Sequence, residues 1–224
     1  LEPYLAPFPY RPLTETGRRP EPLTVGPGTP RWRSYDQLPY VLRRAIIVSE
    51  DATFPFHRGI ELEEIKHALE DAFEGDDRPR GGSTITQQLV KNLFLTRDRT
   101  ALRKAREAAL TLLLEAALEK RQIFELYVNL IEWGPDVYGI HHAAEHYFGT
   151  LPERLTPREM AYLATLIPGP RLYHRHHEAG RVPYRHRKRV DALLARLHRL
   201  GQLEDAAWAR AKKARLRFAP EPAP

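Results

Sequence analysis

The sequence contains no cysteine among its 224 residues. This absence excludes disulfide bonds and thiolate catalysis, and it leaves the redox compartment open. No stretch approaches the roughly 20 consecutive apolar residues that a membrane-spanning helix needs, and no signal-peptide pattern is present. The sequence also lacks internal repeats and a convincing alternation of apolar and polar residues, so no strands are expected.

The balance of apolar and charged residues sets broad limits on the protein. Apolar residues make up 42% of the chain, which is enough for a packed core in one domain with at most a small subdomain. Lys and Arg outnumber Asp and Glu by 35 to 29, for a net charge of +6. This excess favours a partner that carries phosphates, such as a nucleic acid, an anionic lipid or a lipid pyrophosphate. A basic soluble protein with solvated charge is an equally good interpretation.

Helical periodicity dominates the chain after an N-terminal segment, residues 1–34, that carries eight prolines and is expected to be irregular or extended. The pattern predicts helices over residues 38–49, 61–74, 84–95, 101–119, 121–131, 140–148, 157–166, 184–200 and 204–214. Residues 75–82 are expected to form a polar loop, and the proline-rich residues 218–224 a tail or linker stub. We therefore predict an all-α, or nearly all-α, domain over residues 35–217.

Several of these helices have residues at their starts that favour capping. Asp36 is expected to cap the first helix, Ser83 or Thr84 the helix that runs to residue 95, and Thr100 the long helix after it. Residues 156–159, Thr-Pro-Arg-Glu, have the capping-box pattern with proline at the first helical position.

Glu50 is a candidate acid–base residue. It follows the apolar run 45–48, and Phe54 lies shortly after it. A carboxylate among apolar groups has a raised pKa and accepts a proton more readily near neutral pH. Asp51 and His57 are close enough in the sequence to orient it. The competing interpretation is a helix-terminal acid followed by an ordinary turn.

Four polar residues of the helix predicted for residues 84–95 share one face, because Thr84, Gln87, Gln88 and Lys91 are spaced at i, i+3, i+4 and i+7. Hydroxyl, amide and ammonium groups suit sugar hydroxyls and phosphates, and the glycines before this helix let a ligand approach its N-terminus. The alternative is an ordinary solvated face, although such faces are usually filled with Glu and Lys.

Glu107 shares a helix face with Arg103 and Lys104, at the point where a basic turn meets the apolar run 108–114. One interpretation is a surface ion pair that stabilises the helix by a few tenths of a kcal/mol. The other is a second active-site carboxylate with basic neighbours that bind phosphate.

Two further groups of polar residues receive a structural interpretation. Glu125 and Asn129 lie at i and i+4 beside a buried stripe, where satisfied hydrogen bonds hold helices in register. Residues 171–189 are dense in arginine and histidine. Their spacing matches no standard metal-ligand pattern, and the positive charge of the segment would repel a cation, so a metal site is not expected there. We expect them to form a solvated surface that attracts phosphate.

Four ordered segments resemble signature motifs of the peptidoglycan glycosyltransferases, the transglycosylase domains of penicillin-binding proteins. They are residues 50–59 with their acidic pair, Phe54, His57 and Gly59; residues 82–92; Arg103, Lys104 and Glu107; and Lys120, Ile123, Glu125, Tyr127 and Asn129. The fifth motif is weak, because Val190 stands where a second arginine would follow Arg189. Another departure is His67, where the family often has arginine. The resemblance covers roughly residues 35–215, and residues 132–149 look most like the monofunctional transglycosylases.

The resemblance implies a lysozyme-like helical lobe with a smaller, membrane-proximal jaw at roughly residues 60–80 and 94–102. It implies a location on the outer, periplasmic face of the bacterial inner membrane, with the jaw on the membrane surface. The chain begins with Leu1, so we interpret it as a processed or excised fragment that a membrane anchor could have preceded. Cell-wall synthesis proteins are expected partners. Nucleic acid is not, because no basic motif with interleaved aromatic residues is present.

The implied substrate is lipid II, a disaccharide-pentapeptide on undecaprenyl pyrophosphate, which is polymerised into glycan strands. Glu50 would remove the proton from the acceptor 4-hydroxyl, whose oxygen attacks the anomeric carbon of the growing chain with inversion. Glu107 would assist, and a divalent cation bound there is allowed but not obligatory. The residues implied to bind substrate are Asp51, Phe54, His57, Ser83, Thr84, Gln87, Gln88, Lys91, Asn92, Arg99, Arg103 and Lys104. Those of the structural motifs are Lys120, Glu125, Asn129 and Arg189.

Two other functions stay open. A non-catalytic member of the same family would bind lipid II and act as a scaffold, and the weak fifth motif and His67 favour it. A lysozyme-like hydrolase would cleave finished glycan with a carboxylic acid. The amide-rich face and the basic cluster argue against that hydrolase.

Overall fold

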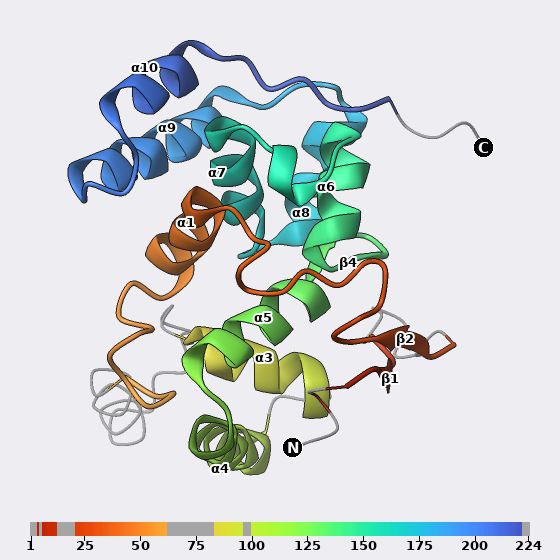
Figure 1. Cartoon of the computed structure of the whole chain (residues 1–224). Helices are drawn as coiled ribbons and strands as arrows, with labels where there is room; N and C mark the ends of the chain where they lie inside the picture. The colour runs from red at the N-terminus through yellow and green to blue at the C-terminus, as the bar shows by residue number, and fades with distance from the viewer. Residues whose placement is uncertain (1–3, 5, 13–20, 62–82, 96–99, 221–224) are drawn as a thin grey trace.

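The computed structural model describes residues 4, 6–12, 21–61, 83–95 and 100–220. These ranges are mostly helical, as predicted (Figure 1). The helices are α1 (Tyr40–Glu50), α3 (Ile85–Phe94), α4 (Ala101–Ala117), α5 (Lys120–Leu130), α6 (Ile140–Phe148), α7 (Pro157–Leu166), α8 (Pro170–Glu178), α9 (Tyr184–Arg199) and α10 (Asp205–Lys213), with a 3-10 helix at Pro152–Arg154.

Part of the expected architecture lies outside the described residues. This part includes almost all of the helix predicted for residues 61–74, the whole loop 75–82, His67 and Arg99. Most of the expected jaw falls there too. Within the described ranges, no helix is both long and apolar enough to cross a bilayer.

Two antiparallel hairpins correct the expectation that strands are absent. β1 (Phe8–Tyr10) pairs with β2 (Leu23–Val25), and β3 (Glu132–Gly134) pairs with β4 (Val137–Tyr138) through an irregular register. None of these strands is longer than three residues. An alternating pattern becomes recognisable only over about four to eight residues, so the sequence carries no signal for them.

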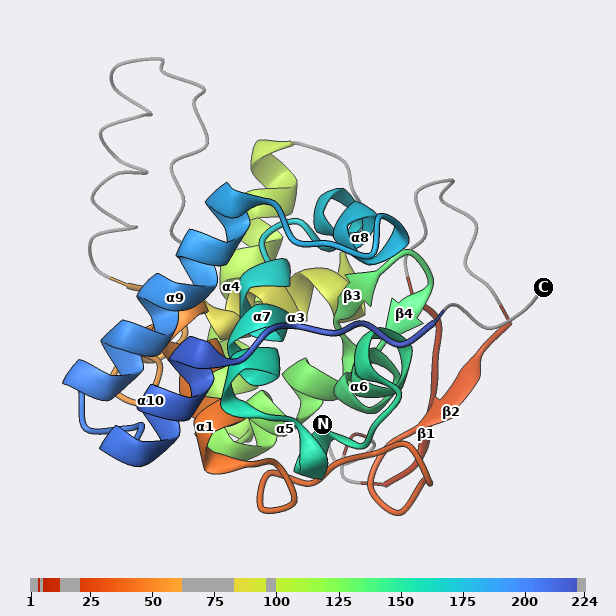
Figure 2. The ribbon, with the colours of Figure 1, turned by 90° about the horizontal axis from the view of Figure 1, so that it is seen from above.

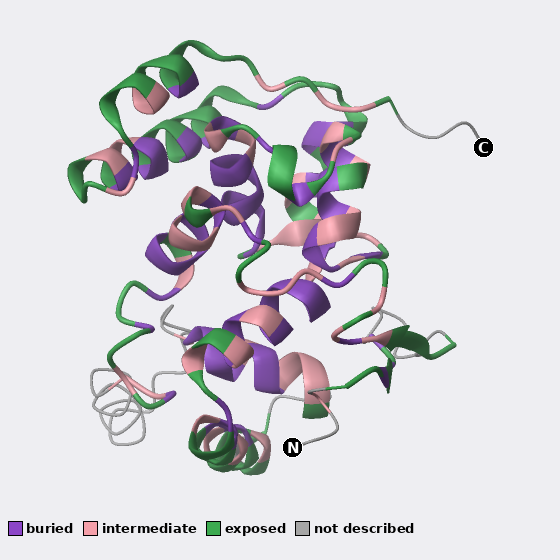
Figure 3. Cartoon of the chain, in the orientation of Figure 1, coloured by how far each residue is buried: buried purple, intermediate pink, exposed green. Residues whose placement is uncertain are grey.

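Helix α7 forms the centre of the upper half of the molecule. Every residue from Met160 to Leu166 is buried, and α7 packs against α1, α9 and α10. Figures 1 and 2 both show it between α1 on one side and α6 on the other, and Figure 3 shows it almost wholly buried. The predicted capping box is confirmed, because the side chain of Thr156 accepts a hydrogen bond from the backbone N–H of Glu159.

The lower half is built from α3, α4 and α5, with α3 packed against both of the others. Side chains with no exposed surface fill the space between α3 and α5, among them Ile85, Leu89 and Phe124. The predicted caps at Thr84 and Thr100 are confirmed, since each side chain accepts a hydrogen bond from the backbone N–H three residues later.

The predicted cap at Asp36 is wrong. Helix α1 begins at Tyr40, after Pro39, and has no side-chain cap. The residue before a proline is disfavoured in the helical conformation, so Leu38 cannot begin the helix. The carboxylate of Asp36 instead contacts the guanidinium of Arg121 on α5.

Glu125 and Asn129 attach the segment before α1 to helix α5. The carboxylate of Glu125 accepts from the Trp32 indole at 2.6 Å and from the backbone N–H of Tyr35 at 2.7 Å. The amide of Asn129 exchanges hydrogen bonds with both backbone groups of Arg33, at 3.0 and 2.8 Å. The structural interpretation of satisfied hydrogen bonds is therefore confirmed, but these bonds hold the segment 32–35 on α5 instead of another helix.

Candidate active site

Glu50 lies at the C-terminal end of α1, two residues after the last of the buried residues 45–48. Its side chain is partly buried, and its carboxylate accepts a hydrogen bond from the amide of Gln88 on α3 at 3.1 Å. Burial raises the pKa of Glu50 above its usual value, and the nearby charge of Asp51 adds to the rise, while hydrogen bonds from Gln88 and Ser49 oppose it. The raised pKa predicted from the sequence is confirmed.

Gln88 is oriented by Tyr127, a residue of the fourth motif to which the sequence analysis gave no role in the site. Its side-chain oxygen accepts from the hydroxyl of Tyr127 on α5 at 2.8 Å, which leaves its NH2 group to face Glu50 and the backbone oxygen of Ser83. Tyr127 is fully buried, and burial raises its pKa far above the usual value, so the hydroxyl keeps its proton and stays a donor. The sequence contained one indication of this role: Tyr127 lies within a buried stripe, and a buried tyrosine hydroxyl needs a hydrogen-bond partner.

Asp51 and His57 position the loop that follows α1. The Asp51 carboxylate accepts from the backbone N–H of Ile85, at the start of α3, and bonds the Nε2 atom of His57, each at 2.9 Å. Because the Nδ1 atom of His57 accepts from the backbone N–H of Gly59 at 2.9 Å, the ring proton sits on Nε2 and points to Asp51. Asp51 is buried, and its hydrogen bonds tie the loop to α3. Its implied role in substrate binding stays a prediction.

Thr84 and Gln87 bond to each other at the start of α3, and their implied role in substrate binding stays a prediction. They form a capping box: the Thr84 side chain accepts from the backbone N–H of Gln87, and the Gln87 side chain accepts from that of Thr84 at 2.8 Å. The Thr84 hydroxyl also donates to the backbone oxygen of Gly59 at 2.6 Å. Both residues are buried. In this structure, the polar groups that were expected to bind sugar cap the start of α3.

Gly59 allows this close approach of the loop to the helices. Its φ of +89° is a conformation that side-chain-bearing residues rarely adopt. A Cβ atom there would lie 2.6 Å from the side chain of Thr111 and 2.8 Å from that of Glu115 on α4. The glycine of the first motif is therefore required by backbone conformation and packing together.

Phe54 is a core residue in the structure, and its implied role in substrate binding stays a prediction. It is 2% exposed, and its ring packs against Phe124 of α5. The ammonium group of Lys120 lies 4.5 Å from the Phe54 ring centroid and pairs with Glu115 at 2.7 Å.

A basic cluster around Glu107 forms the second part of the site. Glu107 accepts from the Arg103 guanidinium at 2.9 Å and from the Lys104 ammonium at 3.0 Å. The side chain of Glu107 is only 1% exposed, whereas that of Lys104 is 48% exposed. Because the carboxylate is buried, these residues do not form an ordinary surface ion pair. Next to this cluster is a pocket of about 610 Å³ lined by Phe94, Leu95, Thr100, Arg103, Arg106, Ala109 and Leu110.

The other proposed ligand-binding residues lie at the two ends of α3. Ser83, Lys91 and Asn92 are partly buried, and the Asn92 amide donates to the backbone oxygen of Gln88 at 2.8 Å. Arg189 lies on the exposed side of α9, where its guanidinium contacts Tyr173.

Residues 171–189 differ from the expected solvated surface. Four of their histidines are buried, with exposures between 4 and 8%: His174, His176, His177 and His186. The reason is that α8 packs against β3 and α7, and α9 against α7, so the inner faces of both helices are covered. The arginines at 175, 181, 185, 187 and 189 remain exposed.

Metal-ligand geometry is present at one place in this site. Asp51, His57 and Glu61 offer ligand atoms that all lie within 4.8 Å of one another. Within the described part of the chain, Glu107 belongs to no such group of three ligands. Its two oxygens are instead engaged by Arg103 and Lys104.

The fold and the site together define a helical protein with a partly buried carboxylate, Glu50, and a separate basic cluster around Glu107. A family model described as Transglycosylase matches residues 23–198, and the chain belongs to this family. It is 49% identical over 142 residues to the biosynthetic peptidoglycan transglycosylase of Alcanivorax borkumensis, covering 63% of this chain and 58% of that protein. It is 43% identical over 167 residues to the one of Nitrosomonas eutropha, covering 75% and 67%.

The chain therefore spans less than two thirds of the length of the first of these relatives. Among solved structures, penicillin-binding protein 1A from Haemophilus influenzae aligns with 60% of this chain and 16% of that chain, at 22% identity and a TM-score of 0.40.

Proposed function

We propose that this chain is a peptidoglycan glycosyltransferase that polymerises lipid II into glycan strands. The observation that carries the proposal is Glu50, a partly buried carboxylate with a raised pKa that the Gln88 amide holds in place. Membership of the transglycosylase family and the names of the relatives support the same activity.

In the proposed reaction Glu50 acts as the general base. It takes the proton of the acceptor 4-hydroxyl, and the oxygen forms a bond to the anomeric carbon of the growing chain. The bond from that carbon to the pyrophosphate oxygen breaks, the carbon is inverted, and undecaprenyl pyrophosphate leaves with the bonding electron pair. A positioned base contributes about 10²–10⁴-fold to such a reaction.

The leaving pyrophosphate needs fixed positive charge, which the basic cluster supplies in this proposal. Arg103 and Lys104 are held in place by the buried carboxylate of Glu107, so they need little rearrangement when the negative charge develops. Glu107 is then a positioning residue for the two cations. Lys91 and Arg99 are proposed to add charge from the family resemblance, and a divalent cation is not required.

We place this activity at the outer face of the bacterial inner membrane, with lipid-linked glycan as partner. Exposed leucines on α4 support contact with a lipid surface, since Leu102, Leu112 and Leu113 are 52–62% exposed. Phe56, in the loop after α1, is 87% exposed. The lysozyme-like lobe, the jaw and cell-wall synthesis partners remain part of this proposal.

Incubation of the chain with fluorescent lipid II tests the activity, with glycan products separated on a gel in the presence of Mg²⁺ or of a chelator. We expect lipid II-dependent polymer under both conditions. Release of reducing ends from finished glycan, without use of lipid II, would identify the hydrolase instead. Binding of lipid II without any polymer would favour the non-catalytic scaffold.

Gln88→Leu is expected to shift the pH dependence of polymerisation. The substitution removes a hydrogen bond that lowers the pKa of Glu50, so this pKa rises further. Glu50 works in its deprotonated form, and the acidic limb of kcat/KM against pH therefore moves to higher pH. The rate on the plateau should fall by much less than the 10²–10⁴-fold that loss of the base causes.

A matched control is Gln202→Leu, which removes an amide that accepts a hydrogen bond from Arg44 and does not contribute to the pKa of Glu50. Its pH profile should overlay that of the unmodified chain. An unchanged acidic limb in Gln88→Leu would mean that the limb reports a group other than Glu50.

A further inference from the structure

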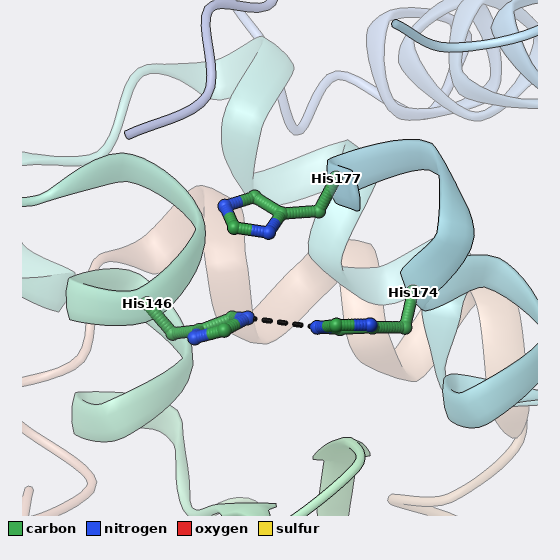
Figure 4. Close-up of side chains that lie close together, drawn as sticks. All are labelled: His146, His174 and His177. Carbon is green, nitrogen blue, oxygen red and sulfur yellow. Dashed lines mark hydrogen bonds between the residues drawn. The ribbon is translucent and has the colours of Figure 1, made fainter. Parts of the chain in front are cut away.

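Three imidazoles from two helices converge at a place separate from the proposed active site. His146 lies on α6, and His174 and His177 lie on α8 (Figure 4). Each offers one ring nitrogen, and these nitrogens all lie within 4.8 Å of one another. Both α6 and α8 are separated from α1, which carries Glu50 at its end, by α7 (Figure 1).

We propose that these three histidines form a zinc site that joins α6 to α8. The Nε2 atoms of His146 and His174 are 3.0 Å apart. In a tetrahedral site with Zn–N bonds of 2.0–2.1 Å, ligand nitrogens lie about 3.3 Å apart, so small ring movements suffice. A hydrogen bond between two imidazoles explains that pair, but it does not explain why a third imidazole joins them.

The positions of the three ligands follow from the helices. His174 and His177 are three residues apart, so both project from one face of α8. That face is buried, with exposures of 8% and 4%. His146 on α6 is partly exposed, which leaves room for water as the fourth ligand. Three protein ligands, such as three histidines, with water in the fourth position are typical of catalytic zinc sites.

Residues around the cluster already orient the rings. The Nδ1 atom of His174 lies 3.2 Å from the Glu178 carboxylate, the arrangement in which a carboxylate fixes a metal-binding imidazole. The ring of Tyr147 lies 4.9, 6.0 and 5.3 Å from those of His146, His174 and His177. Its hydroxyl donates to the Trp133 backbone oxygen at 2.9 Å, so Tyr147 is itself fixed.

One carboxylate lies directly at the cluster, because that of Glu178 is 3.2 Å from the Nδ1 atom of His174. The second nearby acid, Glu132, is paired with Arg171 at 2.7 Å. Arg175, which lies between the two ligands in the sequence of α8, is exposed. The neutral imidazole is the form that binds a metal ion.

The expected consequence of zinc is a more stable C-terminal half. The centroid of the Phe218 ring lies 5.3 Å from that of His177, and the backbone N–H of Ala219 donates to the backbone oxygen of Tyr147 at 2.9 Å. A metal that joins α6 to α8 would therefore also stabilise the position of the segment after α10. Imidazole ligands suit zinc, whereas magnesium prefers oxygen ligands and should have no effect here.

The test uses the 224-residue chain without a polyhistidine tag, stripped with a chelator and titrated with Zn²⁺ by calorimetry. We expect one Zn²⁺ per chain. At free Zn²⁺ of about 100 times Kd, Tm should rise by about 5–10 °C, and Mg²⁺ should not change it. Co²⁺ in its place should give the intense visible absorption of a four-coordinate site. Weak absorption, typical of six-coordinate Co²⁺, would overturn the proposal without any need for a variant.

His146→Gln should weaken Zn²⁺ binding by more than about 100-fold, the upper range for loss of a supporting residue alone. The matched control is His142→Gln, one turn earlier on α6 and also partly buried, which should bind Zn²⁺ normally. His57→Gln tests the other cluster of potential ligands. Unchanged binding in His146→Gln, equal loss in His142→Gln, or loss confined to His57→Gln would each overturn the assignment.

Discussion

Glu50→Gln is expected to lower the rate of lipid II polymerisation by at least about 10²–10⁴-fold, because it removes the proposed general base. The amide has nearly the shape of the carboxylate, so lipid II binding should change little. Initial rates at saturating lipid II, measured beside a binding assay, separate the two effects. Glu145→Gln on the exposed side of α6 is the matched control and should retain full activity. Polymerisation at the unmodified rate would contradict the assignment of Glu50 as the base.

The same substitution should not destabilise the fold at neutral pH. The pKa of Glu50 is raised above its usual 4.5 by burial. Between 4.5 and the pKa in the folded state, the folded protein keeps a proton that the unfolded chain has lost, so stability falls as pH rises through this window. Above the folded-state pKa, burial of the charged carboxylate still destabilises the folded protein. A neutral Gln does not have this destabilising charge, so Tm near pH 7 should be equal or higher. A lower Tm would attribute lost activity to unfolding.

Asp51→Asn is expected to lower the free energy of unfolding by about 2–4 kcal/mol. The buried carboxylate accepts charge-assisted hydrogen bonds from Ile85 N–H and from His57. Hydrogen bonds to a charged group contribute about 1.5–3 kcal/mol each, and the neutral amide retains only part of them. In a domain of this size the change corresponds to a fall in Tm of about 4–16 °C. Polymerisation should fall as well, since the loop after Glu50 is no longer tied to α3.

Asp36→Asn is the control for this prediction, because it makes the same chemical change at an exposed ion pair. Asp36 contacts Arg121 with a side chain that is 80% exposed. Exposed pairs contribute about 0–1 kcal/mol, so thermal unfolding should hardly change. Equal losses in the two variants would show that the hydrogen bonds of Asp51 add nothing beyond an ordinary surface charge.

Local patterns predicted most of the helices correctly. The bounds predicted for residues 140–148 and 157–166 agree with α6 and α7, because apolar spacing and the capping box both depend on neighbours within one turn. The hairpins and α8 were missed. The hairpin strands are too short to show alternation, and the arginines and histidines of α8 hide its helical period.

The candidate site was predicted only in part, as Gln88 and Thr84 illustrate. Both carry polar side chains on the same predicted face of one helix. In the structure Gln88 bonds Glu50, while the hydroxyl of Thr84 is used by Gly59 and by the helix start. Residue type and spacing are alike for the two, so their different roles depend on which other segment lies beside each.

The sequence by itself determined the helical class, the motifs and the apolar surroundings that raise the pKa of Glu50, because these properties depend on residues close together in the chain. Only the tertiary structure decided which polar groups bond to one another within the scaffold. The reason is physical: a hydrogen bond such as that from Tyr127 to Gln88, or the approach of His146 to α8, joins segments 28 or more residues apart. Their distance follows from how whole helices pack, and no local pattern records it.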